Sequence, residues 1–433
     1  MGEVRRALAA GASTAWFQPS APPSQTVRVG PHPCGGTQCP ALEPSRHHCR
    51  MYPERPLDCE LYPFVVTRDA SGRRLLLAVD TKCPYVQQLG AGRALRDYGW
   101  YLLRLLESPS GQRLLVDNPG LAGRPRPEFW VVAPIHDPAP PPAPEPPPGF
   151  VLLSSRWAEF DEALAVSGRP LSAYHRAAWA AWEDLLQCWW GPIGVHHHAV
   201  VAEQAGGYFL ALPPMGPPVT REAMDEAFAQ LDALNGGAPV SRVENLPEDL
   251  AGRCRDWGYA VSLVEQEYLY ERARLERRAE RAASSGQLTV RAYRPEDLDA
   301  CRRAYALWAL KRQADTDDAE ARAMLRDGFY AHRRWLEGAA ALGVLGWVAE
   351  DSEGLCGYTL GTPLSSEAGV ILAEITTLEH EGLPALLTAA LCRALGKPLI
   401  NAMGDARLPA LVRRKMEDHP CAVRPVFSAA RPS

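Results

Sequence analysis

The sequence predicts a mixed α/β protein that is preceded by a small cysteine-rich module. Strand and helix patterns alternate after residue 150, as in α/β proteins. Five of the 11 cysteines lie within the first 83 residues, and a proline run at 137–149 separates the two parts. A chain of 433 residues can hold two or three domains. Its 46% hydrophobic and 22% charged residues are typical of a globular protein.

The composition also sets the expected domain boundaries. The run DPAPPPAPEPPPG at 137–149 predicts a semi-rigid polyproline linker. We therefore expect a flexible arm at 1–30 and the cysteine module at 31–136. Two α/β halves should follow, at 150–285 and 286–433.

Hydrophobic periodicity and turn residues predict the individual elements. In the cysteine module we expect a hairpin of strands 64–67 and 75–79, a helix at 92–106 and a strand at 129–133. In the first half we expect helices at 170–189, 221–234 (capped by Thr220) and 246–257, and strands at 195–202, 208–212 and 240–243. A helix at 270–283 should lead to the second half. There we expect strands at 288–292, 344–350, 357–360, 370–377, 399–402 and 423–428, and helices at 295–308, 317–335, 383–395 and 408–417.

The cysteine-rich segment has too few periodic apolar residues to fold unaided, so disulfides or a metal must hold it. The number of cysteines is odd, and six of them are scattered through the later sequence. This distribution favours a reducing cytoplasm and metal ligation over disulfides. Clustered thiolates suit zinc, iron or an iron–sulfur cluster. The alternative is a set of free buried cysteines. The candidate ligands are Cys34, Cys39, Cys49, Cys59 and Cys83.

One local motif in this segment is specific. It runs Cys49-x-x-Tyr52-x-x-Arg55-Pro56-x-x-Cys59-x-x-Tyr62-Pro63, followed by a hairpin and Cys83-Pro84. The motif resembles the YkgJ-type cysteine-cluster family, which is described as zinc- or iron-chelating. The resemblance covers about 34–85 and implies that Cys39, Cys49, Cys59 and Cys83 are ligands. Cys34 stands where that family has an earlier Cys-Gly cluster.

A second informative run closes the chain. A strand is expected to end at Asn401, and a helix with Pro409 near its start follows a polar turn. Ligand groups of α/β folds lie where a strand end leads to a helix. Asn401 and Asp405 would then point into a crevice, and Lys415 would contact a phosphate. The alternative is a capped helix with a solvated basic face.

This run resembles the closing motif of the phosphatidylglycerol lysyltransferase C-terminal family. Those proteins are twin acetyltransferase-like (GNAT) folds that move an aminoacyl group from aminoacyl-tRNA. The resemblance spans about 150–430 and implies two tandem GNAT-like subdomains with Glu374, Asn401 and Asp405 as catalytic residues. Met403 and Ile375 depart from the family pattern, and its membrane helices are missing, so a lipid acceptor is not implied. Other matching pieces are 208–216, Glu267-Tyr268-Leu-Tyr270, Trp308 and 357–361.

Arginines on the expected helix at 270–283 suggest the donor. Arg277 and Arg278, which replace basic residues of the family pattern, would bind tRNA phosphates. Glutamates interleave with these arginines, so a solvated, ion-paired helix is the alternative. Aminoacyl-tRNA is favoured over acetyl-CoA, because Glu379 and Glu381 would repel a pyrophosphate at the turn before helix 383–395.

The sequence thus predicts a cytoplasmic acyl- or aminoacyl-transferase with a metal-stapled module. The alternative is a non-catalytic metal-binding or adaptor protein on a degenerate transferase scaffold. A net charge of -5 argues against general DNA binding. No stretch of about 18 apolar residues occurs, so membrane insertion is not expected. The acceptor and the oligomeric state stay open.

Overall fold

The computed structural model describes residues 2–19, 25–28, 30–31, 37–43, 48–54, 56–140, 144–168, 170–204, 206–281, 288–377 and 380–432. The chain forms two compact units. The first comprises 1–142 with the segment 309–326, and the second comprises 143–308 with 327–433. Within the described residues, no helix is both long enough and apolar enough to cross a lipid bilayer.

A three-stranded antiparallel sheet organises the first unit, in the order β7 (Phe64–Arg68), β8 (Leu75–Asp80) and β9 (Phe129–Ile135). Helices α4 (Arg93–Glu107) and α5 (Pro109–Asp117) follow β8, and α4 packs against β9. The predicted hairpin, helix and strand are therefore confirmed. The remaining edge of β9 is hydrogen-bonded to the side chain of Gln313, which donates to Val131 O at 2.7 Å and accepts from Val131 N at 2.8 Å.

The N-terminal part of this unit consists of short elements around a very small core. Among the residues described in this part, the buried hydrophobic cluster consists of Ala7, Ala41 and Met51, with partly buried neighbours that include Cys39 and Cys49. A helix occupies part of the segment where we expected an arm. The elements are α1 (Gly2–Ala9), η1 (Thr14–Trp16), β1 (Phe17–Pro19), β2 (Gln25–Val27), β3 (Gly30–Pro31), β4 (Thr37–Gln38), β5 (Leu42–Glu43), β6 (His48–Cys49), η2 (Tyr52–Glu54), α2 (Leu57–Leu61) and α3 (Pro84–Leu89).

The second unit is built on one sheet of 12 strands, in the order β10-β11-β12-β13-β14-β21-β15-β20-β19-β18-β17-β16. This confirms the mixed α/β fold class. The first half contains β10 (Val151–Leu152), η4 (Leu153–Arg156), α6 (Trp157–Ser167), α7 (Arg176–Trp182), β11 (Cys188–Ile193), β12 (His197–Gln204), β13 (Gly207–Leu210), α8 (Arg221–Leu234), β14 (Arg242–Leu246) and α9 (Glu248–Asp256). The second contains β16 (Thr289–Ala292), η5 (Pro295–Asp297), α11 (Leu298–Ala314), α12 (Ala319–Glu337), α13 (Ala339–Leu342), β17 (Leu345–Asp351), β18 (Gly354–Pro363), β19 (Ala368–Thr376), α14 (Leu383–Leu395), β20 (Leu399–Asn401) and α15 (Pro409–Glu417).

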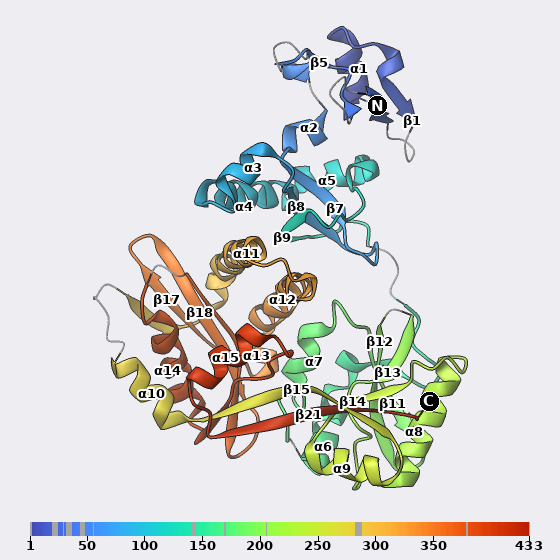
Figure 1. The fold of residues 1–433 in the computed structure, drawn as a ribbon, viewed down its shortest axis with the longest axis vertical. Helices are drawn as coiled ribbons and strands as arrows, with labels where there is room; N and C mark the ends of the chain where they lie inside the picture. Colours follow the sequence, from blue (N-terminus) through green and yellow to red (C-terminus); the bar gives the residue numbers. More distant parts are fainter. Residues whose placement is uncertain are drawn as a thin grey trace. The chain divides into compact units, whose positions relative to one another are not determined.

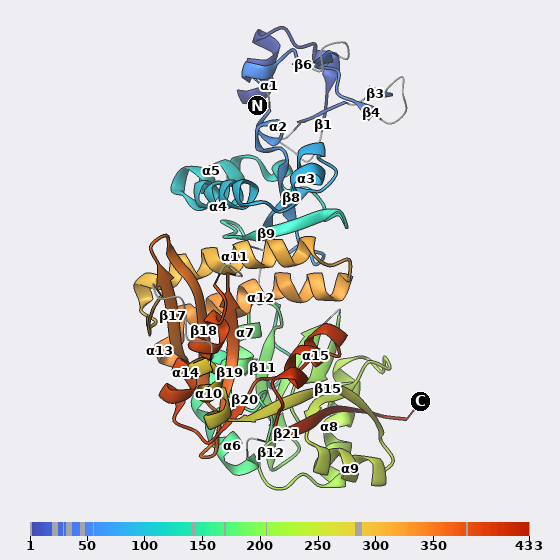
Figure 2. The same cartoon turned by 60° about the vertical axis from the view of Figure 1, so that its left-hand side comes forward.

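Two long strands join the halves. β15 (Ala260–Glu271) pairs antiparallel with β21 (Ala422–Ala430), and both views show them side by side (Figures 1 and 2). β21 also pairs with β14, so the end of the chain completes the sheet of the first half. The last residues of β15 pair instead with β20 of the second half. The sheet is thereby continuous, and helix α10 (Arg272–Arg281) starts directly after β15. The expected boundary at 285 lies outside the described residues.

Two sequence expectations differ from the structure. The helix expected at 170–189 is only Arg176–Trp182, and Trp189 and Trp190 lie on β11. These two neighbours point to opposite faces of the sheet, and each is buried in a different core cluster. Helical periodicity could not reveal that arrangement. The spacing from Trp182 to Trp189 also fits one face of a helix, so this pair of tryptophans does not distinguish a helix from a strand. Strand β15 was not expected, and the helix expected from residue 270 begins at Arg272.

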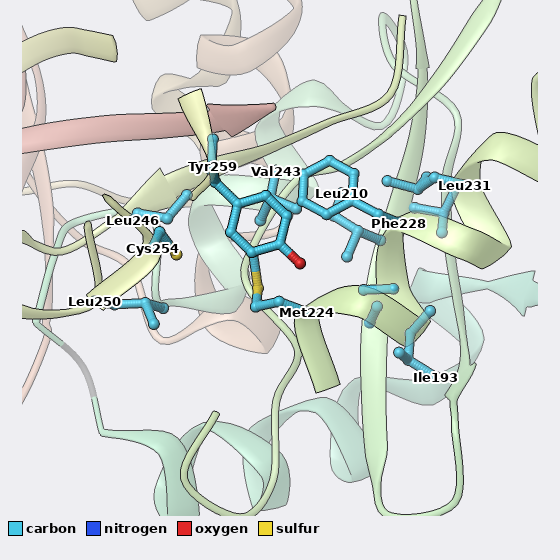
Figure 3. Close-up of a cluster of buried hydrophobic side chains, with 14 of the residues drawn as sticks. Ile193, Leu210, Met224, Phe228, Leu231, Val243, Leu246, Leu250, Cys254 and Tyr259 are labelled. Carbon is cyan, nitrogen blue, oxygen red and sulfur yellow. The ribbon is translucent and has the colours of Figure 1, made fainter. Parts of the chain in front are cut away.

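Helix α8 forms one of the main cores. Its N-cap is Thr220, whose Oγ1 accepts from Ala223 N at 3.3 Å, as the sequence predicted. Its inner face buries Met224, Phe228 and Leu231 against the sheet (Figure 3). The ring of Phe228 stacks on Tyr259 with centroids 5.0 Å apart.

Replacing Phe228 by alanine should destabilise the second unit by about 3–5 kcal/mol, because it leaves a cavity in a fully buried site. Urea unfolding followed by tryptophan fluorescence measures this difference. Val195→Ala is the control, since Val195 is 84% exposed and should change the midpoint little. Equal midpoints for the two variants would contradict the assignment of Phe228 to the core.

Candidate functional site

The site residues predicted in the second unit fall into two groups. Asn401, Asp405 and Lys415 meet at the end of β20, where they contact β15. Glu374 and Arg278 belong to a second group near α10. The two groups adjoin through α15, because Tyr270 Oη donates to Lys415 O at 2.7 Å while Arg278 pairs with Asp418 at 2.5 Å.

Glu267 is the centre of the first group. It is only 2% exposed, yet its carboxylate has three hydrogen-bond donors. Asn401 Nδ2 donates to its Oε2 at 2.6 Å, and the hydroxyl and backbone N–H of Ser172 donate to its Oε1 at 2.5 and 2.9 Å. Asn401 Oδ1 in turn accepts from Met403 N at 2.7 Å. These bonds satisfy a buried charge and fix the end of β20 against β15.

Asp405 is anchored to the same strand. Tyr268 Oη donates to Asp405 Oδ2 at 2.7 Å, and Arg407 N donates to Oδ1 at 2.9 Å. Glu265 Oε2 accepts from Ala406 N at 3.1 Å. Asp405 is 3% exposed and Asn401 is fully buried, so both side chains are engaged within the protein.

The loop between β20 and α15 is strained, and Lys415 holds it. Met403, Ala406 and Arg407 have φ values of 62°, 46° and 56°, a region that side-chain-bearing residues rarely adopt. Lys415 Nζ donates to the carbonyls of Ala402, Met403 and Gly404 at 2.7, 3.0 and 2.6 Å. All three ammonium donors are therefore used on the loop. This arrangement does not favour the phosphate contact that the sequence suggested for Lys415.

The electrostatics follow from burial. Burial raises the pKa of Glu265, and the charges of Glu267 and Asp405 raise it further. Burial also lowers the pKa of Lys415 to about 8, although the carboxylates of Glu265, Asp405 and Glu267 oppose the shift. The group is thus a satisfied polar network that positions the loop.

The second group lies where two parallel strands separate. β19 pairs with β20 only from Ala368 to Val370, and the strand continues to Thr376 beside β18 alone. Glu374 stands on this continuation and is exposed. Burial raises the pKa of the Glu374 carboxyl, although the hydrogen bond that it accepts from Thr388 of α14 and the charges of Arg278 and Arg414 oppose the shift.

Arg278, whose charge acts on Glu374, also lines a small pocket of about 400 Å³. Helix α10 supplies one wall and the end of α15 supplies the other. Arg274 and Arg277 are exposed and form no ion pair with any residue that the structure describes, whereas Arg278 is paired with Asp418. The pocket can therefore present two uncompensated guanidinium groups to an anion. Its lining residues are Arg274, Leu275, Arg277, Arg278, Glu417, Asp418 and His419.

The predicted cysteine ligands lie in the first unit, except that Cys34 falls outside the described residues. Partial burial and the charge of Asp58 raise the pKa of Cys59 to about 12, and the sulfurs of Cys39 and Cys49 contribute. Cys39 and Cys49 thus both lie within electrostatic range of Cys59. Cys83 is buried at the start of α3, and burial together with the neighbouring Cys83 raises the pKa of Tyr62 to about 12. Among the described residues, no three of these sulfurs lie within 4.8 Å of one another.

Sequence reasoning missed the β15 side of the first group. Glu265, Glu267 and Tyr268 were not proposed as site residues, and neither was Ser172. The available signal was the pair of glutamates, Glu265 and Glu267, at alternate positions of β15 beside the buried residues Tyr268 to Tyr270. Two carboxylates on a buried strand demand polar partners, and the run from Asn401 to Lys415 supplies them.

The shifted pKa of Lys415 leads to a pH-dependence prediction. Between about pH 8 and pH 10.5 the folded chain has lost this proton while the unfolded chain keeps it, so the unfolded state binds more protons and stability rises with pH. The contribution is at most about 1.4 kcal/mol per pH unit. The rise should disappear in Lys415→Met when urea midpoints are compared across this range. If the urea midpoint depends on pH equally in the wild type and in Lys415→Met, the lowered pKa of Lys415 is refuted.

Comparison with known proteins agrees with the fold. No protein-family model and no curated protein matches the sequence. A conserved protein of unknown function from Bacteroides thetaiotaomicron matches 65% of this chain and 99% of its own, with 13% identity and a TM-score of 0.55. The C-terminal domain of an Agrobacterium fabrum protein named as a lysylphosphatidylglycerol synthetase matches 64% and 93%, with 13% identity and a TM-score of 0.42. A tandem GNAT protein from the clavulanic acid biosynthesis pathway matches 64% and 95%, with 16% identity and a TM-score of 0.39.

Proposed function

We propose that the second unit is an acyl- or aminoacyl-transferase whose reaction takes place where β19 separates from β20. The observation that carries this proposal is the continuation of β19 from Ile371 to Thr376, which has a strand partner on one side only. Its other edge leaves backbone N–H and C=O groups available to a ligand. The exposed carboxylate of Glu374 stands on the same stretch.

The chemistry would be attack by an amine or hydroxyl on an ester carbonyl. A backbone N–H on the free edge of β19 would stabilise the tetrahedral oxyanion, an interaction typically worth about 3–4 kcal/mol per donor. Glu374 would orient the nucleophile and accept its proton. The alcohol end of the donor would leave as the new amide or ester forms.

The donor we favour is aminoacyl-tRNA. Exposed Arg274 and Arg277 offer two guanidinium groups in the pocket that Arg278 also lines, and phosphates are natural ligands of guanidinium groups. The sequence resemblance to the phosphatidylglycerol lysyltransferase C-terminal family, with its tandem GNAT-like subdomains, points to the same donor. Acetyl-CoA is disfavoured by Glu381 in the turn before α14, where a pyrophosphate would have to bind.

In this proposal Asn401 and Asp405 are positioning residues. Both are buried, and their side chains hold the end of β20 and the following loop against β15. Their position determines where β20 leaves β19. Their loss would therefore move the site without removing a reacting group.

A non-catalytic adaptor is the second candidate. The observation in its favour is that Asn401, Asp405 and Lys415, the predicted site residues at the end of β20, all have internal partners. A scaffold that binds tRNA without reacting would also use the exposed arginines. The two candidates differ in whether Glu374 affects turnover.

We also propose that the first unit binds zinc or iron through Cys39, Cys49 and Cys59, with Cys34 or Cys83 as further ligands. The support is that the sulfurs of Cys39 and Cys49 both raise the pKa of Cys59, and that the hydrophobic cluster beside Cys39 and Cys49 consists of three small or flexible residues. Thiolates gathered in a segment with so little core are suited to a structural metal. No disulfide joins any cysteine that the structure describes, which is consistent with a reducing location such as the cytoplasm.

The transferase proposal predicts that Glu374→Gln lowers transfer by about 10²–10⁴-fold, because the base is lost. The assay follows loss of labelled amino acid from charged tRNA, with phosphatidylglycerol vesicles or a cell extract as acceptor. Acetyl-CoA is tested in parallel by thiol release. Glu296→Gln, an exposed glutamate of the same half, should leave the rate unchanged.

A Glu374→Gln rate equal to that of the wild type would remove Glu374 from the chemistry. If tRNA binds but neither donor is consumed, the adaptor is favoured. If nothing binds, both candidates fail.

The metal proposal predicts that each of Cys39→Ser, Cys49→Ser and Cys59→Ser lowers the metal content of the purified chain. Elemental analysis of protein prepared without added metal measures this content. Cys254→Ser is the control, since Cys254 is buried in the core of the second unit. A wild-type chain that holds neither zinc nor iron, even after reconstitution under reducing conditions, would overturn the proposal.

A further inference from the structure

We propose a zinc site in the second unit, formed by Asp351, Cys356 and His380. Among the described residues these three are the one group of His, Cys, Asp and Glu side chains whose ligand atoms all lie within 4.8 Å of one another. The group is separate from the cysteines of the first unit. It is also independent of the proposed transfer reaction.

Local backbone structure brings the first two side chains together. Asp351 ends β17 and Cys356 lies on β18 of the same hairpin. Ala349 pairs with Gly357 and Glu350 pairs with Leu355, so Cys356 is the extra residue of a β-bulge, and its Sγ donates to Ala349 O at 3.3 Å. A bulge redirects a side chain that regular pairing would send to the other face.

The third residue is held in place by its own neighbours. Thr377 N donates to Cys356 O at 2.8 Å, which ties the segment after β19 to the bulge. His380 Nε2 then meets Asp351 Oδ2 at 2.7 Å. The other oxygen, Asp351 Oδ1, accepts from Glu353 N at 2.7 Å and Gly354 N at 3.1 Å, so the carboxylate is oriented before any ion arrives.

The donor set selects the metal. A thiolate, an imidazole and one carboxylate oxygen are ligands that zinc accepts together, at about 2.0–2.3 Å. Calcium and magnesium require oxygen ligands and are disfavoured by the sulfur and nitrogen. Binding would release the Cys356 thiol proton to solvent and replace the Asp351–His380 contact with two metal bonds.

Burial indicates how the site would work. Cys356 is 4% exposed, whereas Asp351 and His380 are half-buried, so the sulfur lies on the inner side of the group. Three protein ligands leave a fourth position for water or an external ligand. Beneath the site, Cys356 packs with Leu383 and Leu387 of α14. A bound ion would therefore fasten the start of α14 to the β17–β18 hairpin.

The test uses Co²⁺ as a spectroscopic probe of the metal-free full-length chain, followed by competition with zinc. Cys356→Ser and His380→Gln should each remove one equivalent of tightly bound metal, with affinity reduced by about 100-fold or more. Cys356→Ser should also remove part of the sulfur-to-cobalt absorption. The matched control is Cys392→Ser, a buried cysteine of α14 that lies outside the group.

The cysteines of the first unit would contribute their own cobalt absorption. The test therefore compares the metal stoichiometry and the spectrum of each variant with those of the wild type. An unchanged stoichiometry and spectrum in both Cys356→Ser and His380→Gln would overturn the proposal. Circular dichroism separates loss of a ligand from loss of folding. In a folded Asp351→Asn variant, full zinc retention would overturn the carboxylate's role.

Discussion

The structure of the second unit depends on one shared strand. β15 pairs with β21 over most of its length and with β20 at its end, while β21 pairs with β14 of the first half. Neither half of the sheet is complete without these two strands. The last residues of the chain therefore contribute to the core of the first half, where Phe427 and Ala429 pack with Phe228 and its neighbours.

The same strand explains why so many charges are buried in one place. Glu265 and Glu267 cannot avoid the interior once β15 joins the halves, and burying an unpaired carboxylate is costly. Asn401, Ser172 and the backbone of the following loop satisfy them. The three loop residues with positive φ and the three-carbonyl contact of Lys415 then follow from the need to fold that loop around the carboxylates.

Much of this fold could be predicted from local pattern. Helices α8 and α14 have the predicted bounds, because each has a clear apolar face and a defined start. β15 could not be predicted in the same way. Its stretch from Glu265 to Glu271 mixes charged and aromatic residues, and its partners lie more than 120 residues away in sequence. For the site, Asn401 and Asp405 were identifiable from their motif, whereas Glu267 required knowledge of which strand lies beside β20.

The two proposed metal positions would differ in consequence because their surroundings differ. Near Cys39 and Cys49 the buried cluster among the described residues is Ala7, Ala41 and Met51, so the free energy of metal binding would be a large part of what holds that segment. Cys356 lies instead against Ala349, Leu383 and Leu387, beside a continuous sheet that folds by its own hydrophobic core. Removing metal from the second unit should therefore loosen only the start of α14, whereas removing it from the first should unfold the cysteine-rich segment.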